Sequence, residues 1–350
     1  MMNKYIDPNL PLIDLHRHLD GSVRLETILE LGLQHNLPLP AADLQGLRPF
    51  VQVTTPKPDI LAFFQKFQWQ VGILVDYDAC YRIAYENVED ARNEGIDYIE
   101  LRFSPWFMAD PNGLDPVGVV EAVVAGVAAG SAAFGVKTNL IGIVSRTYGP
   151  DIGRKELDAL LTQRDKLIAL DLAGDELNFP GEWFVDHFRQ GRDAGWQITV
   201  HAGEAGGAAS IWQALRELGA SRIGHAVSAV QDPALMDYLV EQRIGIETNL
   251  TSNVQTSTVP SYAAHPLKVM LEHGVFATIN TDDPGISAID LPFEYRMAVE
   301  EAGLAPQQAA QAQQNSLDIA FLSDTEKAAL IAKKQPAKIK IGKYPDWSNL

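Results

Sequence analysis

Cysteine is nearly absent from this 350-residue sequence, because Cys80 is its only cysteine. A single cysteine cannot form an internal disulfide, and such usage is typical of proteins from a reducing compartment. The N-terminal residues also lack the apolar core of a secretory signal. We therefore expect a cytoplasmic protein.

Positive charge is scarce as well. The chain has 28 Lys and Arg residues against 45 Asp and Glu residues, which gives a formal net charge of −17. A negative protein repels phosphate backbones, so nucleic acid is not expected as a partner. The sequence also lacks the GxGxxG and GxxxxGK[ST] patterns that cradle phosphates. An uncharged small-molecule substrate fits this composition better than a nucleotide.

One nearly uncharged run, residues 117–136, is long enough to raise the question of a membrane span. Glu121 interrupts this run, and its valines recur at helical spacing. These features favour a helix that packs on a sheet. We therefore predict no membrane association.

Eight short apolar runs predict β-strands, at residues 11–15, 96–103, 138–145, 166–173, 196–202, 222–226, 244–250 and 275–281. Runs that are apolar throughout are typical of strands covered on both faces. Helical patterns, such as residues 77–92 and 211–219, lie between them, and this alternation predicts parallel pairing. The favoured fold is an α/β (β/α)8 TIM-type barrel, because a closed ring gathers polar strand ends that an open doubly wound sheet would spread out.

The predicted barrel forms a single domain over residues 1–350, with a core at about 11–330 and a C-terminal tail at 331–350. Roughly 80 residues separate the first two strands, which predicts extra helices there. Residues 60–67 are apolar at helical spacing, and they fit a core helix or a lid over the barrel mouth equally well. The lysine-rich segment from Lys327 predicts a solvated or frayed terminus.

Four motifs at strand ends carry candidate metal ligands. The first strand leads into His16-Arg17-His18, the fifth into His201, and the eighth into Asp282. An isolated His-x-His pair is also compatible with a hydrogen-bonded turn, and Asp-Asp-Pro with a capped turn. A barrel brings all four side chains to one mouth, and three imidazoles with one carboxylate suit zinc and leave room for a water molecule. We predict one Zn²⁺ per chain.

Three neighbouring residues are candidates for the chemistry. Glu204 follows His201 by three residues and suits proton transfer, although a first-turn helix acid is the alternative. His225 ends the sixth strand and would polarise water, or it is a hydrogen-bonded core histidine. Asp283 points away from Asp282 on an extended chain, so it is a candidate for substrate contact.

Six motifs also resemble the adenosine and AMP deaminase family of the amidohydrolase superfamily. They follow the same order as in that family, and they are HRHLDG at 16–21, DLAGDE at 171–176, HAGE at 201–204, RIGHA at 222–226, LTSN at 250–253 and TDDP at 281–284. The resemblance implies a zinc-dependent hydrolase that converts adenosine to inosine and ammonia, and 2′-deoxyadenosine to 2′-deoxyinosine, in purine salvage. The implied partner is therefore a purine nucleoside.

The resemblance also assigns roles. The implied zinc ligands are His16, His18, His201 and Asp282. Glu204 would protonate ring nitrogen 1, and His225 would orient and stabilise the attacking hydroxide. Asp283 would form a hydrogen bond to ring nitrogen 7, and the Gly174 backbone would contact ring nitrogen 3. Asp20 and His18 would lie near the ribose. Phe63 and Phe67 resemble a hydrophobic gate.

One residue departs from the family pattern, and three rival functions stay open. The family has Gly where this chain has Ala226, which puts the rate and substrate range in question. Adenine deaminases of the same family carry Glu where Asp20 stands, so the nucleoside is favoured over the free base. Another purine nucleoside is an alternative substrate. A non-catalytic nucleoside-binding protein is the alternative of a different class, and it should have lost a metal ligand or Glu204.

Overall fold

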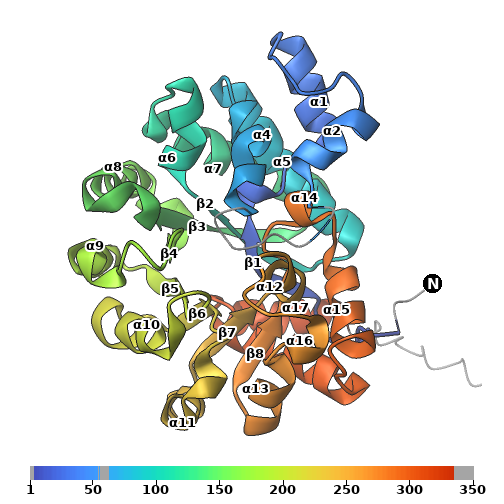
Figure 1. Ribbon diagram of the computed structural model, residues 1–350, viewed down its shortest axis with the longest axis vertical. Coiled ribbons are helices and arrows are strands. Elements are labelled where there is room, and N and C mark those ends of the chain that lie inside the picture. Colours follow the sequence, from blue (N-terminus) through green and yellow to red (C-terminus); the bar gives the residue numbers. More distant parts are fainter. Residues whose placement is uncertain (1–3, 54, 56–62, 335–350) are drawn as a thin grey trace, which may run out of the picture.

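The computed structural model describes residues 4–53, 55 and 63–334. Eight parallel strands stand in chain order, and helices surround them on the outside (Figure 1). The strands are β1 (Ile13–His18), β2 (Tyr98–Phe103), β3 (Lys137–Ser145), β4 (Leu167–Ala173), β5 (Gln197–Ala202), β6 (Arg222–His225), β7 (Gly245–Thr248) and β8 (Phe276–Ile279). Each of the eight predicted runs overlaps a strand, which confirms the (β/α)8 barrel.

The barrel closes between β1 and the segment that follows β8. Strand β8 ends at Ile279, so the expectation that Asp282 ends the last strand was wrong by three residues. Asp282 has a positive φ of 63°, a left-handed conformation that interrupts strand pairing but that Asp tolerates better than most residues. Its backbone nevertheless bonds to β1, because His18 N donates to Asp282 O at 2.8 Å and Asp282 N donates to His16 O at 2.7 Å. Three predicted metal ligands therefore share the backbone seam that joins the two ends of the sheet.

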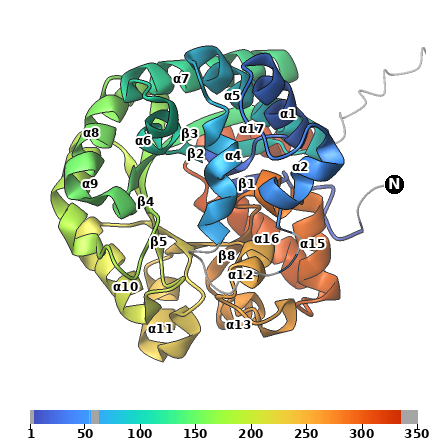
Figure 2. The same cartoon turned by 45° about the horizontal axis from the view of Figure 1, so that its top comes forward.

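Extra helices fill the interval between β1 and β2, as predicted from its length. They are α1 (Leu25–Gln34), α2 (Leu44–Val51), α4 (Gln68–Gly72) and α5 (Tyr77–Glu94). Helices α1, α2 and α4 lie on the same side of the barrel as β1 (Figure 2). Helix α5 begins at the cap Asp76, whose carboxylate accepts from Ala79 N, and it ends at Gly95.

The remaining helices follow the later strands. They are α6 (Pro105–Ala109), α7 (Pro116–Phe134), α8 (Gly149–Leu161), α9 (Val185–Asp193), α10 (Gly207–Gln213), the π-helical turn η7 (Ala214–Leu218), α11 (Pro233–Glu241), α12 (Leu250–Gln255), α13 (Leu267–His273), α14 (Pro284–Ser287), α15 (Leu291–Glu300), α16 (Pro306–Ile319) and α17 (Asp324–Lys334). Helix α17 contradicts the expected frayed terminus over residues 327–334. Its last residue, Lys334, places its ammonium 2.7 Å from Asp97 Oδ2. The rest of the predicted tail lies outside the described residues.

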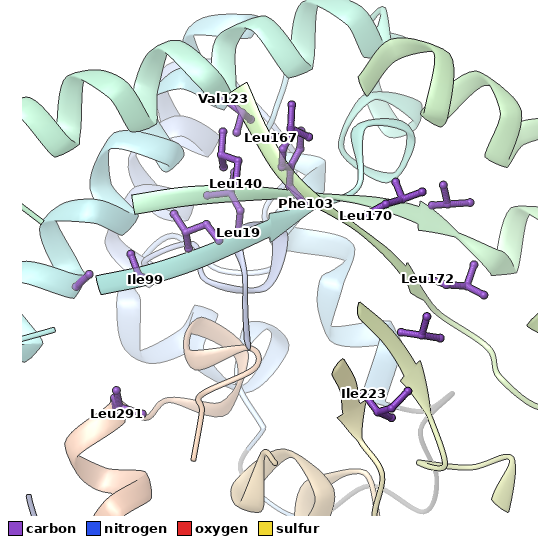
Figure 3. Packing of buried hydrophobic residues seen from close by; sticks show 14 of the residues in the cluster. Leu19, Ile99, Phe103, Val123, Leu140, Leu167, Leu170, Leu172, Ile223 and Leu291 are labelled. Carbon is purple, nitrogen blue, oxygen red and sulfur yellow. The ribbon is translucent and has the colours of Figure 1, made fainter. Parts of the chain in front are cut away.

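The main apolar core lies between the strands and the outer helices. Figure 3 shows part of it, including Phe103 of β2, Leu140 of β3 and Val123 of α7. Among the described residues, one helix, α7, is long and apolar enough to cross a membrane. Its buried valines join this core, so α7 belongs to the outer ring of the barrel, as the helical spacing predicted.

The inside of the barrel is charged rather than apolar. Arg102 on β2 lies 2.9 Å from Asp171 Oδ2 on β4 and 2.7 Å from Glu247 Oε2 on β7. Below this layer, Arg222 on β6 pairs with Glu247 and Glu100. All five side chains are fully buried. Such buried charges are stable only when they are paired, so this network fixes the barrel strands relative to one another.

Candidate metal centre and active site

The structure brings the four predicted metal ligands together. One donor atom from each of His16, His18, His201 and Asp282 lies within 4.8 Å of the others, and all four residues are buried. His16 and His18 point the same way because they are two residues apart on β1. His18 Nε2 lies 3.1 Å from His201 Nε2 and 3.4 Å from Asp282 Oδ1. This buried group of three imidazoles and one carboxylate has the composition of a metal site.

Two acids of the barrel interior orient the imidazoles. His16 Nδ1 donates to Glu247 Oε2 at 2.7 Å, and His201 Nδ1 donates to Asp171 Oδ1 at 3.1 Å. With the ring protons on Nδ1, the Nε2 lone pairs of both rings face the centre. His16 Nε2 has no hydrogen-bond partner among the described residues, although Asp282 Oδ1 lies 3.2 Å away. Lone pairs that face a carboxylate repel one another unless a cation lies between them, so the donor set fits a metal ion.

The electrostatics agree with a cation at this position. Burial lowers the pKa of His201 to about 4, so its ring is neutral at pH 7. Burial also disfavours charge on His18, but Asp20, Asp283 and Asp282 outweigh it and raise the pKa of His18 to about 9. The surrounding carboxylates therefore favour positive charge at the centre of the site.

Glu204 lies on a tight turn that another carboxylate holds. Glu176 accepts hydrogen bonds from the backbone N–H groups of Gly203 at 2.6 Å, Ala205 at 2.7 Å and Gly206 at 2.9 Å. Burial raises the pKa of Glu204 well above its usual range, and Asp282, Glu176 and Asp283 raise it further. The surroundings of Glu204 therefore favour its protonated form. Glu204 lies in the loop between β5 and α10, which begins at Gly207, so it is not a first-turn acid of that helix.

His225 faces both Glu204 and the ligand group. Its Nδ1 lies 3.5 Å from Glu204 Oε1, and its Nε2 lies 3.7 Å from Asp282 Oδ2. Asn253 Nδ2 donates to His225 Nδ1 at 3.0 Å. Burial lowers the pKa of His225 well below its usual range. The ring is therefore a neutral group positioned between the candidate proton donor and the metal ligands.

Asp283 contacts Gly21 rather than the ligand group. A Cβ atom at Gly21 would lie 1.7 Å from Asp283 Oδ1, so only glycine leaves room for this carboxyl group. Burial, together with the adjacent charge of Asp282, raises the pKa of Asp283 well above its usual range. A protonated Asp283 carries an O–H that can donate to an acceptor in the cavity.

A cavity leads from solvent to these groups. Its outer part has a volume of about 200 Å³ and is lined by His18, Asp20, Ser104, Thr147 and Gly174, with Phe64, Phe67 and Phe107 as apolar walls. Its inner part, of about 60 Å³, reaches Glu204, His225 and Asp283. The two parts share His18, Phe64 and Gly174.

Position 174 requires glycine, because its backbone conformation and its surroundings leave no room for a side chain. Its φ is +113°, and a Cβ atom would lie 2.4 Å from Thr147 Oγ1. Asp20 accepts from Ser104 N at 3.1 Å and lies in the outer part of the cavity. Phe63 and Phe67 are both buried, and they line the inner part of the cavity. Residues 60–62 of the predicted core helix or lid lie outside the described residues.

Ala226, which stands where the family pattern has Gly, has a strained backbone conformation. Ala226 has a φ of 51° and is fully buried, and His225 before it has a φ of 64°. Left-handed backbone is open to glycine but strained for alanine. The structure thus explains why a glycine suits this position.

Five residues that support the site had been given no role from the sequence. They are Arg102, Asp171, Glu176, Glu247 and Asn253. Asp171 and Glu247 each interrupt an apolar strand, and an acid at such a position must have a partner. Glu176 and Asn253 lie in the DLAGDE and LTSN motifs of the resemblance, so a signal existed for them, although it assigned them no role.

Comparisons with known proteins identify the family. The family model described as adenosine deaminase matches residues 11–335. An adenosine deaminase from Vibrio cholerae is 59% identical over 328 residues, which cover 94% of this chain and 98% of the relative. The chain belongs to the adenosine deaminase family. An adenosine deaminase is a hydrolase, so the prediction of a hydrolytic enzyme is confirmed.

Solved structures of the same family architecture agree with this fold. An adenine deaminase from Arthrobacter aurescens superposes with a TM-score of 0.86 at 26% identity, and the match covers 93% of this chain and 98% of that one. An amidohydrolase from Burkholderia ambifaria, determined with bound Zn, superposes with a TM-score of 0.84 at 25% identity, covering 95% and 90% of the two chains.

Proposed function

We propose that this member of the adenosine deaminase family hydrolyses adenosine and 2′-deoxyadenosine to inosine or 2′-deoxyinosine and ammonia. The observation that carries the proposal is the convergence of His16, His18, His201 and Asp282 beside Glu204 and His225. Every ligand and the candidate proton donor are present, so the non-catalytic alternative has no support in the site.

The proposed cofactor is one Zn²⁺ ion per chain, held by His16, His18, His201 and Asp282. The lone pairs of His16 and His201 already face the centre, which supports this ligand set. When bound, zinc supplies Lewis acidity that lets water act as a nucleophile near neutral pH.

The protein side chains supply the proton transfer. The raised pKa of Glu204 favours its protonated form, and Glu204 lines the inner part of the cavity, so it would donate its proton to ring nitrogen 1 of the purine. Protonation of that nitrogen makes carbon 6 electrophilic, so water adds to carbon 6. The C–N bond between carbon 6 and the amino group then breaks. His225 donates a hydrogen bond to the attacking oxygen. The attacking water gives up both of its protons: one converts the amino group to ammonia, the other restores the proton of Glu204, and the purine keeps the oxygen.

The remaining residues hold the nucleoside. Asp283 would donate to ring nitrogen 7, since its raised pKa favours the protonated form. The Gly174 backbone would contact ring nitrogen 3, while Asp20 and His18 would contact the ribose. Asp20 lines the outer part of the cavity, whereas Glu204 lines the inner part.

The main rival is deamination of free adenine, as in the Arthrobacter aurescens relative. The 59% identity to an adenosine deaminase, against 26% to that adenine deaminase, favours the nucleoside. The cavity volume of about 200 Å³ next to Asp20 also leaves room for a sugar. We propose that the enzyme works in the cytoplasm on a small purine nucleoside, without nucleic acid or membrane as a partner.

The test is a substrate panel with purified enzyme. Loss of adenosine, 2′-deoxyadenosine and adenine is followed by absorbance, before and after removal of metal with a chelator and after zinc is added back. We expect turnover of both nucleosides, loss of activity on metal removal, and recovery with zinc. Faster turnover of adenine would replace the proposed substrate, and activity in a preparation shown to hold no metal would contradict the mechanism.

A further inference from the structure

A buried histidine outside the catalytic group connects to it through one side chain. His265 lies between η9 (Tyr262–Ala264) and α13, and it is 4% exposed. Its Nε2 lies 3.2 Å from Asn253 Oδ1 on α12. Asn253 Nδ2 in turn lies 3.0 Å from His225 Nδ1 and 3.4 Å from Glu204 Oε1. Neither His265 nor Asn253 is among the residues that line the inner cavity.

One backbone group fixes the direction of every bond in this chain. Leu267 N donates to His265 Nδ1 at 3.1 Å, so Nδ1 must be unprotonated. Burial lowers the pKa of His265 to about 3, so the ring is neutral and its proton is on Nε2. His265 Nε2 therefore donates to Asn253, and the Asn253 oxygen must face it. The amide nitrogen of Asn253 then faces the catalytic residues and can only donate to them.

The other neighbours of His225 do not compete with this direction. Asn249 Nδ2 lies 3.3 Å and 3.4 Å from the two ring nitrogens, so it does not select between them. Glu204 Oε1 is farther from His225 Nδ1, at 3.5 Å, than Asn253 Nδ2 is. Since Nδ1 accepts from Asn253, a neutral His225 ring carries its proton on Nε2, the nitrogen that faces Asp282.

We propose that His265 is a positioning residue, which acts through Asn253 to hold the ring proton of His225 on Nε2. His225 is then a hydrogen-bond donor to the attacking oxygen and not a base that removes its proton. The second Asn253 hydrogen occupies Glu204 Oε1, which leaves Glu204 Oε2 to carry the proton for the substrate. This inference rests on the proposed roles of His225 and Glu204, whereas the direction of the hydrogen bonds rests on Leu267 N alone.

The test measures the position of the His225 proton directly. Imidazole ¹⁵N chemical shifts distinguish a protonated from an unprotonated ring nitrogen, and they are recorded on the zinc-loaded enzyme with ¹⁵N-labelled histidine. A His225→Gln sample assigns the signals. The expected wild-type result is a protonated Nε2 and an unprotonated Nδ1 in His225. An unprotonated Nε2 in the wild type would overturn the proposal.

Two variants at His265 separate hydrogen bonding from packing. His265→Phe keeps the ring volume but removes the donor. We expect kcat to fall about 10- to 100-fold, which is no more than the lower end of the roughly 10²- to 10⁴-fold that general acid–base catalysis contributes, with KM changed less than about 3-fold. His265→Gln can donate from its amide nitrogen to Asn253 Oδ1, and it should restore the tautomer and most of kcat. A folded His265→Phe with the wild-type His225 signals and kcat would refute the relay.

A third variant reverses the direction of the bonds. Asn253→Asp is close in shape but can only accept, so His225 should become protonated on Nδ1. This result is expected even if His265→Phe fails to fold, and an unchanged Nδ1 would overturn the proposal. His273→Phe is the control, because His273 is an exposed histidine on α13 that pairs with Asp237 at 2.9 Å. It should change neither the His225 signals nor kcat.

The outcomes also separate this inference from the proposed function. If the wild type does not deaminate adenosine, the proposed function fails, while the ¹⁵N signals still test the relay. If the wild type is active and Glu204→Gln is not, but His265→Phe leaves the His225 tautomer unchanged, only the relay fails.

Discussion

Replacement of Asp171 by Asn should weaken zinc binding by changing which nitrogen of the His201 ring carries the proton. Asp171 Oδ2 accepts from Arg102 Nη1 at 2.9 Å, and His201 Nδ1 lies 3.1 Å from Oδ1 and 3.0 Å from Oδ2. An Asn side chain replaces one of these two acceptors with an N–H donor. At the Oδ2 position its amide nitrogen would face both the guanidinium and the imidazole, and at the Oδ1 position it would face only the imidazole.

The relative energies decide which orientation is adopted. Because Asn is neutral, the ion pair to Arg102 is lost in both orientations. An amide nitrogen against Arg102 would in addition leave the buried guanidinium without this hydrogen-bond acceptor, which costs about 1–3 kcal/mol. An amide nitrogen against His201 requires only that the ring proton moves from Nδ1 to Nε2. The second orientation is therefore preferred, and it removes the Nε2 lone pair that faces the ligand group. Loss of such an oriented ligand typically lowers metal affinity by about 10- to 100-fold, which corresponds to about 1.4–2.7 kcal/mol.

The assay is competition for zinc against a chelator of known affinity, with urea denaturation as a measure of folding. Asp165→Asn is the matched control, because Asp165 is an exposed acid just before the same strand. The control should bind zinc like the wild type. A folded Asp171→Asn enzyme with unchanged zinc affinity would refute the argument that Asp171 sets the His201 tautomer.

Four further changes test other parts of the site. Glu204→Gln should keep zinc but lose about 10²- to 10⁴-fold in kcat, as expected for a proton donor, and a wild-type rate would show that the donor is misassigned. Asp20→Ala should raise KM for adenosine more than for an analogue with a truncated ribose, and equal effects would remove Asp20 from sugar recognition. Burial raises the pKa of Glu156 to about 8, so the folded state gains stability from its protonation below about pH 4.5 and loses it as the pH rises through about 8. Glu156→Gln should therefore flatten the dependence of the free energy of unfolding on pH in this window, measured by urea titrations, and an unchanged slope would contradict the assignment. Ala226→Gly relieves a φ of 51° and should raise the free energy of unfolding by about 0.5–1 kcal/mol, whereas a decrease would show that the buried methyl group matters more than the strain.

The sequence predicted those features that depend on the residues of a single strand. Each apolar run lies within a few residues of an observed strand because burial on both faces leaves a continuous apolar pattern. His16 and His18 were accessible for the same reason, since a spacing of two on a strand needs no tertiary information. His201 and Asp282 could be added because strand ends meet on one side of a closed barrel.

The features that were missed depend on closure of the barrel. Arg102 joins Asp171 to Glu247 across strands β2, β4 and β7, and no sequence distance predicts that contact. The conformation of Asp282 was missed as well, because its backbone pairs with β1 in place of a continued β8. The helix over Lys327–Lys334 was missed because an ion pair to Asp97 anchors a segment that looks solvated in isolation.

The charged interior favours a cation at the ligand group. Three buried carboxylates, those of Glu100, Asp171 and Glu247, pair with two buried guanidiniums, those of Arg102 and Arg222. Asp282 lies in the ligand group itself, and the pKa of Asp282 is held well below its usual range, by His225 and His16 against the cost of burial. Uncompensated charge is expensive in a low-dielectric interior. The same carboxylates that orient the imidazoles of His16 and His201 therefore also make a cation at the proposed site more favourable.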